Sequence, residues 1–393
     1  MSIRPLEQTG SQLLAGLFIL LILVNYISCD TSEPLTPVTF PEARPDLDMP
    51  MQFELQNLTT TLTGQKVEIN QSIENYEFKN CEVLLNGDGI EISNCLFENS
   101  SVFAAEINNA VFDRVIFQNF NQYEKTALYI NDSQAIVVRN SMFVGNYIGL
   151  VIHFSSIEII DNRFEDNNGH NALVVSGGSS AVVKGNYFYG SFPHAIMIMN
   201  RGEAPETRVI ISGNIIDQTG EDAIDFEDYR NAAPSIVSNN LITNSGWAAV
   251  VIEYNSWQSN ITVENNWIEN TGIDWKLPTH TLQPESFGPG WGHGILVEDS
   301  TQVRIINNRI LSATENGIEI RNSQEVEITG NGIDCNQAGI GVYRYNEYSL
   351  YREFSPLSEE NAGDSQVIAD NNVIYSAQKD YDVDESCQFT LVE

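Results

Sequence analysis

The sequence predicts an all-β protein built as a parallel solenoid, in which short strands wind into stacked coils of about 23 residues. Apolar and polar residues alternate with a period of two over short runs, which is typical of short strands. One frame of residues recurs along the chain, and asparagine recurs at one position of that frame. The unit is too short for a propeller blade and lacks the leucine-rich signature, so a coil of three short strands fits best.

The repeating frame is clearest in residues 149–164, 294–310 and 317–333. Each copy has a small residue, two alternating apolar residues, a polar turn, two more alternating apolar residues, an asparagine and a further apolar residue. The asparagines lie 24, 28, 26, 26, 42, 23 and 41 residues apart, so two coils carry long insertions. They are Asn162, Asn186, Asn214, Asn240, Asn266, Asn308, Asn331 and Asn372. Cys95 holds this position in an earlier coil, which extends the pattern toward residue 52.

Asparagine suits this corner because it tolerates a left-handed backbone and its amide can bond its counterpart in the next coil. The chain holds 41 asparagines, and we interpret this column as architecture rather than catalysis. The alternation predicts that Ile295, Val297, Val303, Ile305 and Ile310 point inward. Each coil then adds about 4.8 Å along the solenoid axis.

The N-terminus has the features of a targeting segment. The apolar run at 13–24 is too short for a comfortable membrane span and suits a signal-peptide core within residues 1–29. Cys29 stands where a bacterial lipoprotein carries its lipidated cysteine, which would tether the protein to a membrane, and ordinary cleavage or an uncleaved anchor are the alternatives. Residues 30–51 predict an extended linker, and 52–393 the solenoid domain. The protein is therefore expected to be secreted, or anchored at the cell surface or outer membrane as a lipoprotein.

The composition restricts the partners. The chain carries 53 Asp and Glu against 19 Lys and Arg, a net charge of −34. Such a field repels phosphate backbones, so nucleic acid is excluded as a partner. It also disfavours direct binding of a polyanionic polysaccharide, whereas a neutral glycan or a Ca²⁺-bridged uronate is easier to accommodate.

The repeats of the form GIxI…NNxI resemble those of right-handed parallel β-helix proteins of the pectate-lyase-like superfamily, over about residues 52–378. This resemblance implies a right-handed parallel β-helix. It does not select an activity, because the superfamily includes polysaccharide lyases, glycosidases, esterases, epimerases, tailspikes and adhesins.

Candidate functional residues occupy the outward positions of the strand that follows each small residue, because these positions stack from coil to coil. Charge and imidazole gather there between His194 and Arg344, most densely in residues 221–230. Carboxylates one coil apart share a proton or bind a cation, and their spacing suits a glycosidase. The predicted catalytic residues are Asp222, Asp225, Glu227, Glu253, His293 and Glu298.

Two other interpretations of the acidic run remain open. Its oxygen ligands suit Ca²⁺, the one cofactor that the sequence suggests, and the ligands would be Asp222, Asp225, Glu227 and Asp228. Alternatively, the carboxylates form a solvated acidic face on a very acidic protein.

Aromatic residues lie beside these acids in the sequence. All five tryptophans fall between Trp247 and Trp291, and the insertion 271–290 exceeds the repeat and must project. Flat rings beside carboxylates suit sugar stacking, although the tryptophans can equally pack against the solenoid wall. The predicted substrate-binding residues are His194, Tyr254, Trp275, Trp291, Arg321 and Arg344.

Three short segments resemble fragments of family motifs. The sequences DAID at 222–225 and GHGI at 292–295 resemble polygalacturonase signatures, but alanines replace the paired aspartates expected one coil later. YGSFPH at 189–194 resembles a motif of alginate epimerases, with Phe192 in place of an acid. The sequence thus predicts a protein that acts on a polysaccharide as a glycoside hydrolase or Ca²⁺-assisted lyase, with a non-catalytic glycan-binding or adhesin-like module as the alternative.

Four cysteines follow the targeting segment. In an oxidising compartment they can form one bridge at each end of the solenoid, and proximity in sequence favours Cys81–Cys95 and Cys335–Cys387 among the three possible pairings.

Overall fold

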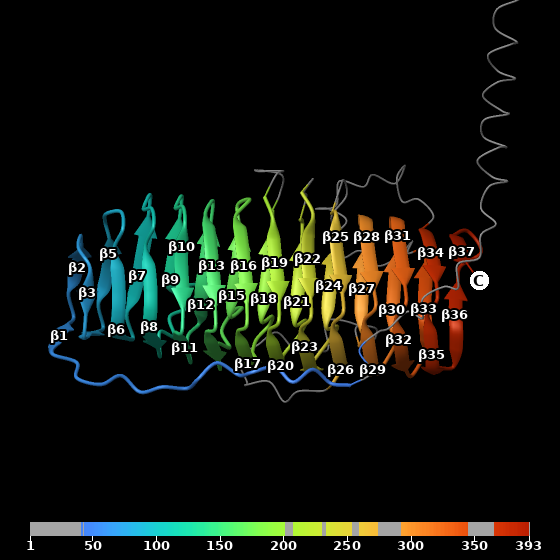
Figure 1. The fold of residues 1–393 in the computed structure, drawn as a ribbon, viewed down its shortest axis with the longest axis horizontal. Helices are drawn as coiled ribbons and strands as arrows, with labels where there is room; N and C mark the ends of the chain where they lie inside the picture. Colours follow the sequence, from blue (N-terminus) through green and yellow to red (C-terminus); the bar gives the residue numbers. More distant parts are fainter. Residues whose placement is uncertain are drawn as a thin grey trace, which may run out of the picture. The chain divides into compact units, whose positions relative to one another are not determined.

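A computed structural model describes residues 41, 43–200, 207–229, 233–253, 259–273, 292–344 and 365–392 of the chain. All of them belong to one compact unit, residues 39–393. This unit is a parallel β-helix whose strands stack in register, each on its counterpart in the neighbouring coil (Figure 1). The predicted all-β solenoid is confirmed.

One wall of the solenoid is a thirteen-stranded parallel sheet, which we call sheet B. Its strands are β2 (Lys66–Ile69), β5 (Glu82–Leu85), β7 (Ser101–Ala105), β9 (Thr126–Asn131), β12 (Ile148–His153), β15 (Leu173–Ser176), β18 (Ile196–Met199), β21 (Ile224–Glu227), β24 (Val250–Glu253), β27 (Ile295–Glu298), β30 (Ile318–Arg321), β33 (Ala338–Tyr343) and β36 (Lys379–Val383). Each pairs with the strand before and after it in this order.

The other strands form sheet A, in which two rows lie side by side and join through the long strands β6 (Glu91–Glu98) and β8 (Val111–Gln118). The first row continues through β3 (Ile73–Glu74), β10 (Ile136–Arg139), β13 (Ser156–Ile160), β16 (Ser180–Lys184), β19 (Val209–Ser212), β22 (Ser235–Ser238), β25 (Ile261–Glu264), β28 (Thr301–Ile306), β31 (Gln324–Thr329), β34 (Gln366–Asp370) and β37 (Gln388–Val392). The second row contains β1 (Thr60–Thr63), β4 (Tyr76–Lys79), β11 (Met142–Val144), β14 (Arg163–Glu165), β17 (Tyr187–Ser191), β20 (Ile215–Thr219), β23 (Leu241–Ser245), β26 (Trp267–Thr271), β29 (Arg309–Ala313), β32 (Gly332–Cys335) and β35 (Val373–Ser376).

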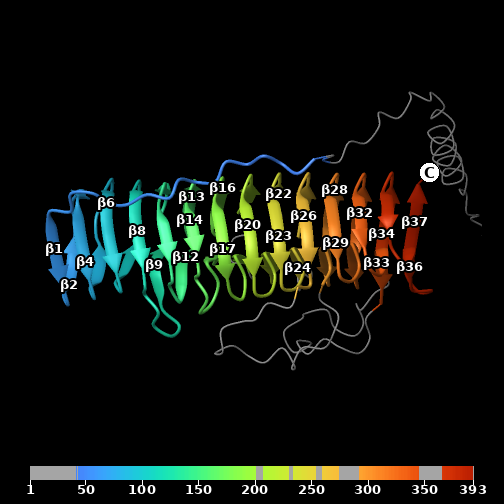
Figure 2. The same ribbon diagram turned by 90° about the horizontal axis from the view of Figure 1, so that it is seen from below.

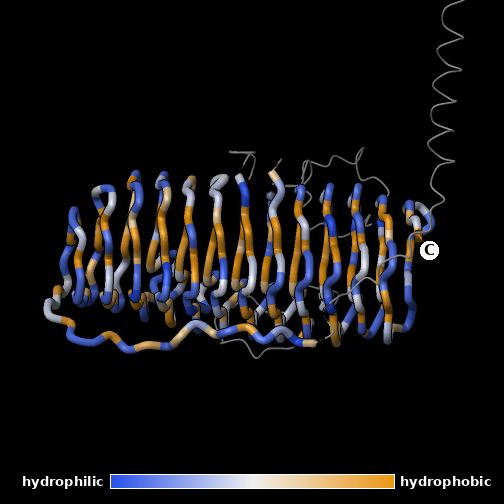
Figure 3. Tube along the Cα trace, viewed as in Figure 1, coloured by the Kyte–Doolittle hydropathy of each residue, from blue (hydrophilic) through white to orange (hydrophobic). Residues whose placement is uncertain are grey.

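The interior is apolar because alternate side chains along the strands point inward. Hydrophobic residues accordingly recur along each coil (Figure 3). The five residues predicted to point inward, Ile295, Val297, Val303, Ile305 and Ile310, are all fully buried. Phenylalanines also stack inside, for example Phe143 on Phe164 with ring centroids 4.7 Å apart. Repeated burial of identical positions holds neighbouring coils in one register.

The asparagine column forms a hydrogen-bonded ladder. The Oδ1 of Asn240 accepts from the backbone N–H and the Nδ2 of Asn214, at 2.9 Å each. The Nδ2 of Asn240 in turn donates to Asn266 Oδ1. The left-handed residue of this corner is the one before the ladder asparagine, for example Asn239 with φ 56°. One asparagine was predicted to fill both roles, whereas two adjacent positions divide them.

The two predicted disulfides are wrong, since Cys81, Cys95, Cys335 and Cys387 are free thiols. Cys81 lies in the column of Ser100, and Cys95 in the column of Val115, so the two occupy different corners. Cys335 ends β32, whereas Cys387 precedes β37 in the column of Ser365. Proximity in sequence is a poor guide to pairing here, because residues that are close in sequence lie at different positions around the circumference of a coil.

Residues 43–58 run along the outside of the coils, as the blue trace in Figures 1 and 2 shows. Leu47 packs on an outer cluster of Ile215, Leu241 and Trp267, and the carbonyl of Pro50 accepts from Arg163. The predicted signal segment and Cys29 lie outside the described residues. Within the described residues, no helix is long and apolar enough to cross a membrane.

Candidate functional site

The outer face of sheet B has the predicted register. Asp225 pairs with Val251 and Glu227 with Glu253 between β21 and β24, and Glu253 pairs with Glu298 of β27. In the next coil, Arg321 of β30 pairs with Glu298. The predicted stack of three glutamates is therefore present, one coil between neighbours.

The acidic run at 221–225 surrounds His194, which precedes β18. The Nδ1 of His194 lies 3.7 Å from Asp222 Oδ2, and its Nε2 lies 3.7 Å from Asp225 Oδ2 and 3.8 Å from Glu221 Oε2. His194 and Asp225 are 9% and 3% exposed, and Asp225 Oδ1 has no hydrogen-bond partner among the described residues. We call His194, Glu221, Asp222 and Asp225 the His194 cluster.

Burial controls the protonation of this cluster. It raises the pKa of Glu221 to about 7 and, together with the charge of Glu221, raises the pKa of Asp222 well above its usual value. The pKa values of Asp225 and Glu253 are raised by burial and then by neighbouring carboxylates. Burial also lowers the pKa of His194 to about 3. Burial thus favours the protonated form of these carboxyl groups and the neutral form of the imidazole.

A second cluster surrounds His293, which precedes β27. Its Nε2 lies 3.3 Å from Glu315 Oε2, and its Nδ1 lies 3.3 Å from Glu319 Oε2. Arg321 binds Glu319 and also Glu298, the latter at 3.1 Å. Burial raises the pKa of Glu298 despite the opposing charge of Arg321. Arg321 was predicted to bind substrate, but two buried glutamates already engage its guanidinium group.

Asn316 and Tyr343 extend this second cluster. The Nδ2 of Asn316 donates to Glu319 Oε2 at 2.6 Å, and the hydroxyl of Tyr343 donates to Asp382 at 3.2 Å. Between the two clusters, Ala248, Val251 and Leu296 form a small buried apolar group although they lie on the outer face. Glu253 lies on the same strand as Val251 of this group, and this strand, β24, lies between the coils of the His194 cluster and of His293.

Other predicted residues lie elsewhere. Arg344 follows β33, where its backbone N–H donates to Asp384. Tyr254, Trp275, Trp291 and most of the insertion 271–290 lie outside the described residues. Trp247 is half-buried next to Glu221, whereas Trp267 packs on sheet A beneath Leu47. Tryptophans that are close in sequence therefore lie at different walls of the solenoid.

The predicted Ca²⁺ ligands share one strand and its ends. Asp222 Oδ1 already accepts the backbone N–H of Ala248 at 2.9 Å, and Asp228 adopts φ 52° in the corner after β21. Among the described residues, no group of three or more His, Cys, Asp or Glu side chains is arranged to hold a metal ion.

Glu221 and Glu315 belong to the two clusters but were not predicted as site residues from the sequence. Glu221 stacks on Pro193, the residue before His194, and Glu315 stacks on Gly292, the residue before His293. Extending the repeating frame by one residue toward the N-terminus would have found them.

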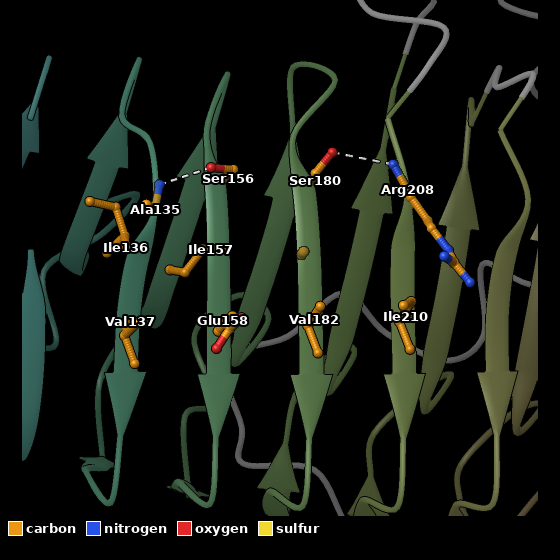
Figure 4. A pocket seen from close by; sticks show the side chains of 11 residues that line it. Ala135, Ile136, Val137, Ser156, Ile157, Glu158, Ser180, Val182, Arg208 and Ile210 are labelled. Atoms are coloured by element: carbon orange, nitrogen blue, oxygen red, sulfur yellow. Dashed lines mark hydrogen bonds between the residues drawn. The ribbon is translucent and has the colours of Figure 1, made fainter. Parts of the chain in front are cut away.

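A shallow groove of about 360 Å³ lies on a different wall, over β10, β13, β16 and β19 (Figure 4). Its floor is formed by Val137, Val182 and Ile210, with Glu158 and Arg208 beside them. This groove belongs to sheet A and holds none of the candidate site residues.

Comparisons with known families identify the class of fold. Residues 61–206 match the family described as right handed beta helix region, and residues 205–386 match the family described as periplasmic copper-binding protein (NosD). These matches, together with the stacked parallel strands, establish a right-handed parallel β-helix fold. No curated protein sequence matches it.

Solved structures share this fold at low identity. A mutant of the periplasmic alginate epimerase AlgG is 14% identical, with a TM-score of 0.54, over 84% of this chain and 77% of its own. The catalytic domain of a GH87 alpha-1,3-glucanase in complex with nigerose is 12% identical, with a TM-score of 0.55, over 85% of this chain and 63% of its own. At such identities the likeness establishes the fold alone.

Proposed function

We propose that this protein hydrolyses a neutral polysaccharide on the outer face of sheet B. The observation that carries the proposal is the row of carboxyl groups around the buried Asp225 and the half-buried Glu253, whose pKa values are raised by loss of solvation and mutual repulsion. A carboxyl group that stays protonated near neutral pH is a general acid for the glycosidic oxygen. The similar folds of an alginate epimerase and an alpha-1,3-glucanase support a carbohydrate as the substrate.

The geometry suggests roles for individual carboxylates. Glu253 stacks one coil from Glu227, a backbone spacing of about 4.8 Å, near the carboxylate separation of retaining glycosidases. Glu253 is assigned as the acid, and Glu227 or Asp225 as the partner that attacks the anomeric carbon. Glu298 bonds to Arg321, so its carboxylate is held in place and is assigned a positioning role.

The test is an assay for new reducing ends with neutral glucans including α-1,3-glucan, xylan, galactan, pectate and alginate. Cleavage of a neutral polymer is expected, and Glu253→Gln should lower its rate by about 10²–10⁴-fold. Glu158→Gln on β13 is the matched control, because Glu158 is an exposed glutamate on the opposite sheet. Full activity of Glu253→Gln and Asp225→Asn would reject the site.

A Ca²⁺-assisted lyase is the second candidate, favoured by the buried and unpartnered Asp225 Oδ1. A lyase would release unsaturated uronates that absorb ultraviolet light, and chelation would abolish the reaction. Metal analysis of the purified protein for calcium and copper tests the cation directly. Glycan binding without any product would support the adhesin-like alternative.

We further propose export to the periplasm or cell exterior, with a lipid tether on Cys29. The descriptions of the NosD family and of AlgG as periplasmic support export. Mass spectrometry of the mature N-terminus tests the tether, since a diacylglyceryl group on Cys29 is expected and a terminus at another residue would exclude it.

A further inference from the structure

One column of the outer face of sheet B is apolar over six consecutive strands before it reaches the candidate site. Strand pairing places its members one coil apart, and Met197 pairs directly with Asp225. The column consists of Leu84, Phe103, Tyr129, Val151, Val174 and Met197. We call these six residues the apolar column.

The far end of the apolar column is exposed. Leu84 and Phe103 are 43% and 44% exposed, and the rings of Phe103 and Tyr129 stack in parallel with centroids 5.4 Å apart. A shallow groove of about 520 Å³ runs beside Leu84 and Phe103 over β2, β5 and β7. Leu84, Phe103 and Tyr129 thus form a contiguous apolar patch that is partly open to solvent, and such patches mark binding surfaces.

A polar column runs beside the apolar one. Asn131 pairs with His153, and His153 with Ser176, and the Nδ1 of His153 lies 3.0 Å from the hydroxyl of Ser176. These three positions hold an amide, an imidazole and a hydroxyl, which donate and accept hydrogen bonds. Neither column carries a carboxylate, lysine or arginine from Phe103 to Met197. Between Phe103 and Met197 the surface therefore pairs apolar area with hydrogen-bonding groups and lacks charge, whereas Lys66, Glu68 and Glu82 line the groove at its far end.

We propose that the apolar column binds an extended neutral glycan chain that lies along the solenoid axis, with its reacting bond at Asp225 and Glu253. This inference rests on the proposed function. Each coil advances about 4.8 Å, close to the length of one sugar unit in an extended chain, so successive sugars meet successive members of the column. Sugar C–H faces pack on the rings of Phe103 and Tyr129, while hydroxyl groups bond to the polar column.

Native gels that contain neutral glucan, xylan, galactan or alginate test the proposal through the retardation of the protein. The wild type should be retarded in at least one neutral gel, and Phe103→Ala and Tyr129→Ala should each weaken that affinity by about two- to tenfold. Both side chains point outward, so circular dichroism should show an unchanged fold. Tyr375→Ala is the matched control, because Tyr375 is an aromatic residue 53% exposed on β35 of sheet A.

Chain length separates this proposal from the proposed function. Phe103→Ala should impair cleavage of the polymer more than cleavage of a disaccharide or trisaccharide, whereas Glu253→Gln should impair both to a similar extent. Three results would overturn the assignment of the column. They are no retardation in any neutral gel, equal retardation of the wild type and both ring variants, and preferential retardation by alginate. None of these results depends on which carboxylate is the acid.

Discussion

Removal of one ladder asparagine should cost more stability than any exposed substitution beside it. Asn240→Ala deletes four buried hydrogen bonds of 2.9–3.0 Å, two accepted by Oδ1 and two donated by Nδ2. At about 1 kcal/mol for each bond, the expected loss is about 4 kcal/mol. The backbone N–H of Asn214 and the carbonyl of Ile211 would be left buried without these partners, which keeps the cost from falling much below that figure.

The adjacent Asn239 supplies the control. It is exposed and adopts φ 56°, so Asn239→Gly should be nearly neutral and Asn239→Ala should cost about 1–2 kcal/mol. Urea unfolding followed by far-ultraviolet circular dichroism measures all three variants. A loss below 1 kcal/mol for Asn240→Ala, or equal losses for Asn240→Ala and Asn239→Gly, would refute the division of roles between the two positions.

Three further predictions concern the core, the protonation of the site and the thiols. Ile305→Asp should unfold the protein, because it places an unpaired charge in the core at a cost of about several kcal/mol, whereas Arg304→Asp on the exposed side should be tolerated in thermal melts. The pKa of Glu221 rises from 4.5 to about 7 on folding, so its contribution to stability is lost as pH rises across that range, and Glu221→Gln should remove this decline. His194, with a pKa lowered from 6.5 to about 3, acts in the opposite sense, and His194→Gln should remove a loss of stability below pH 6.5. Because all four cysteines of the solenoid are free, a reducing agent should leave the melting temperature unchanged, and a drop would indicate a disulfide.

The fold was accessible from sequence because each coil repeats the same burial pattern. The ladder from Asn162 to Asn372 and the inward positions such as Ile305 follow directly from that period. The stacking of Glu227 on Glu253 was accessible for the same reason, since register in a parallel solenoid is set by the repeat itself.

Side-chain partners could not be predicted from the repeat. Its frame places Arg321 beside Glu298 but does not reveal that Glu319, on the same strand, completes a buried ion pair that occupies the guanidinium group. Nor does it reveal that Trp267 faces sheet A, or that His194 lies among three acids of the next coil. Such details depend on rotamers and on how far each side chain reaches across neighbouring coils.

The most direct test of the account is a crystal structure of the Glu253→Gln variant with an oligosaccharide of the neutral glycan that the wild type cleaves or binds. The account predicts sugar density on the outer face of sheet B, with a glycosidic bond beside Asp225 and residue 253 and further sugars toward Tyr129 and Phe103. Density confined to sheet A, such as the groove over β13 and β16, would contradict it.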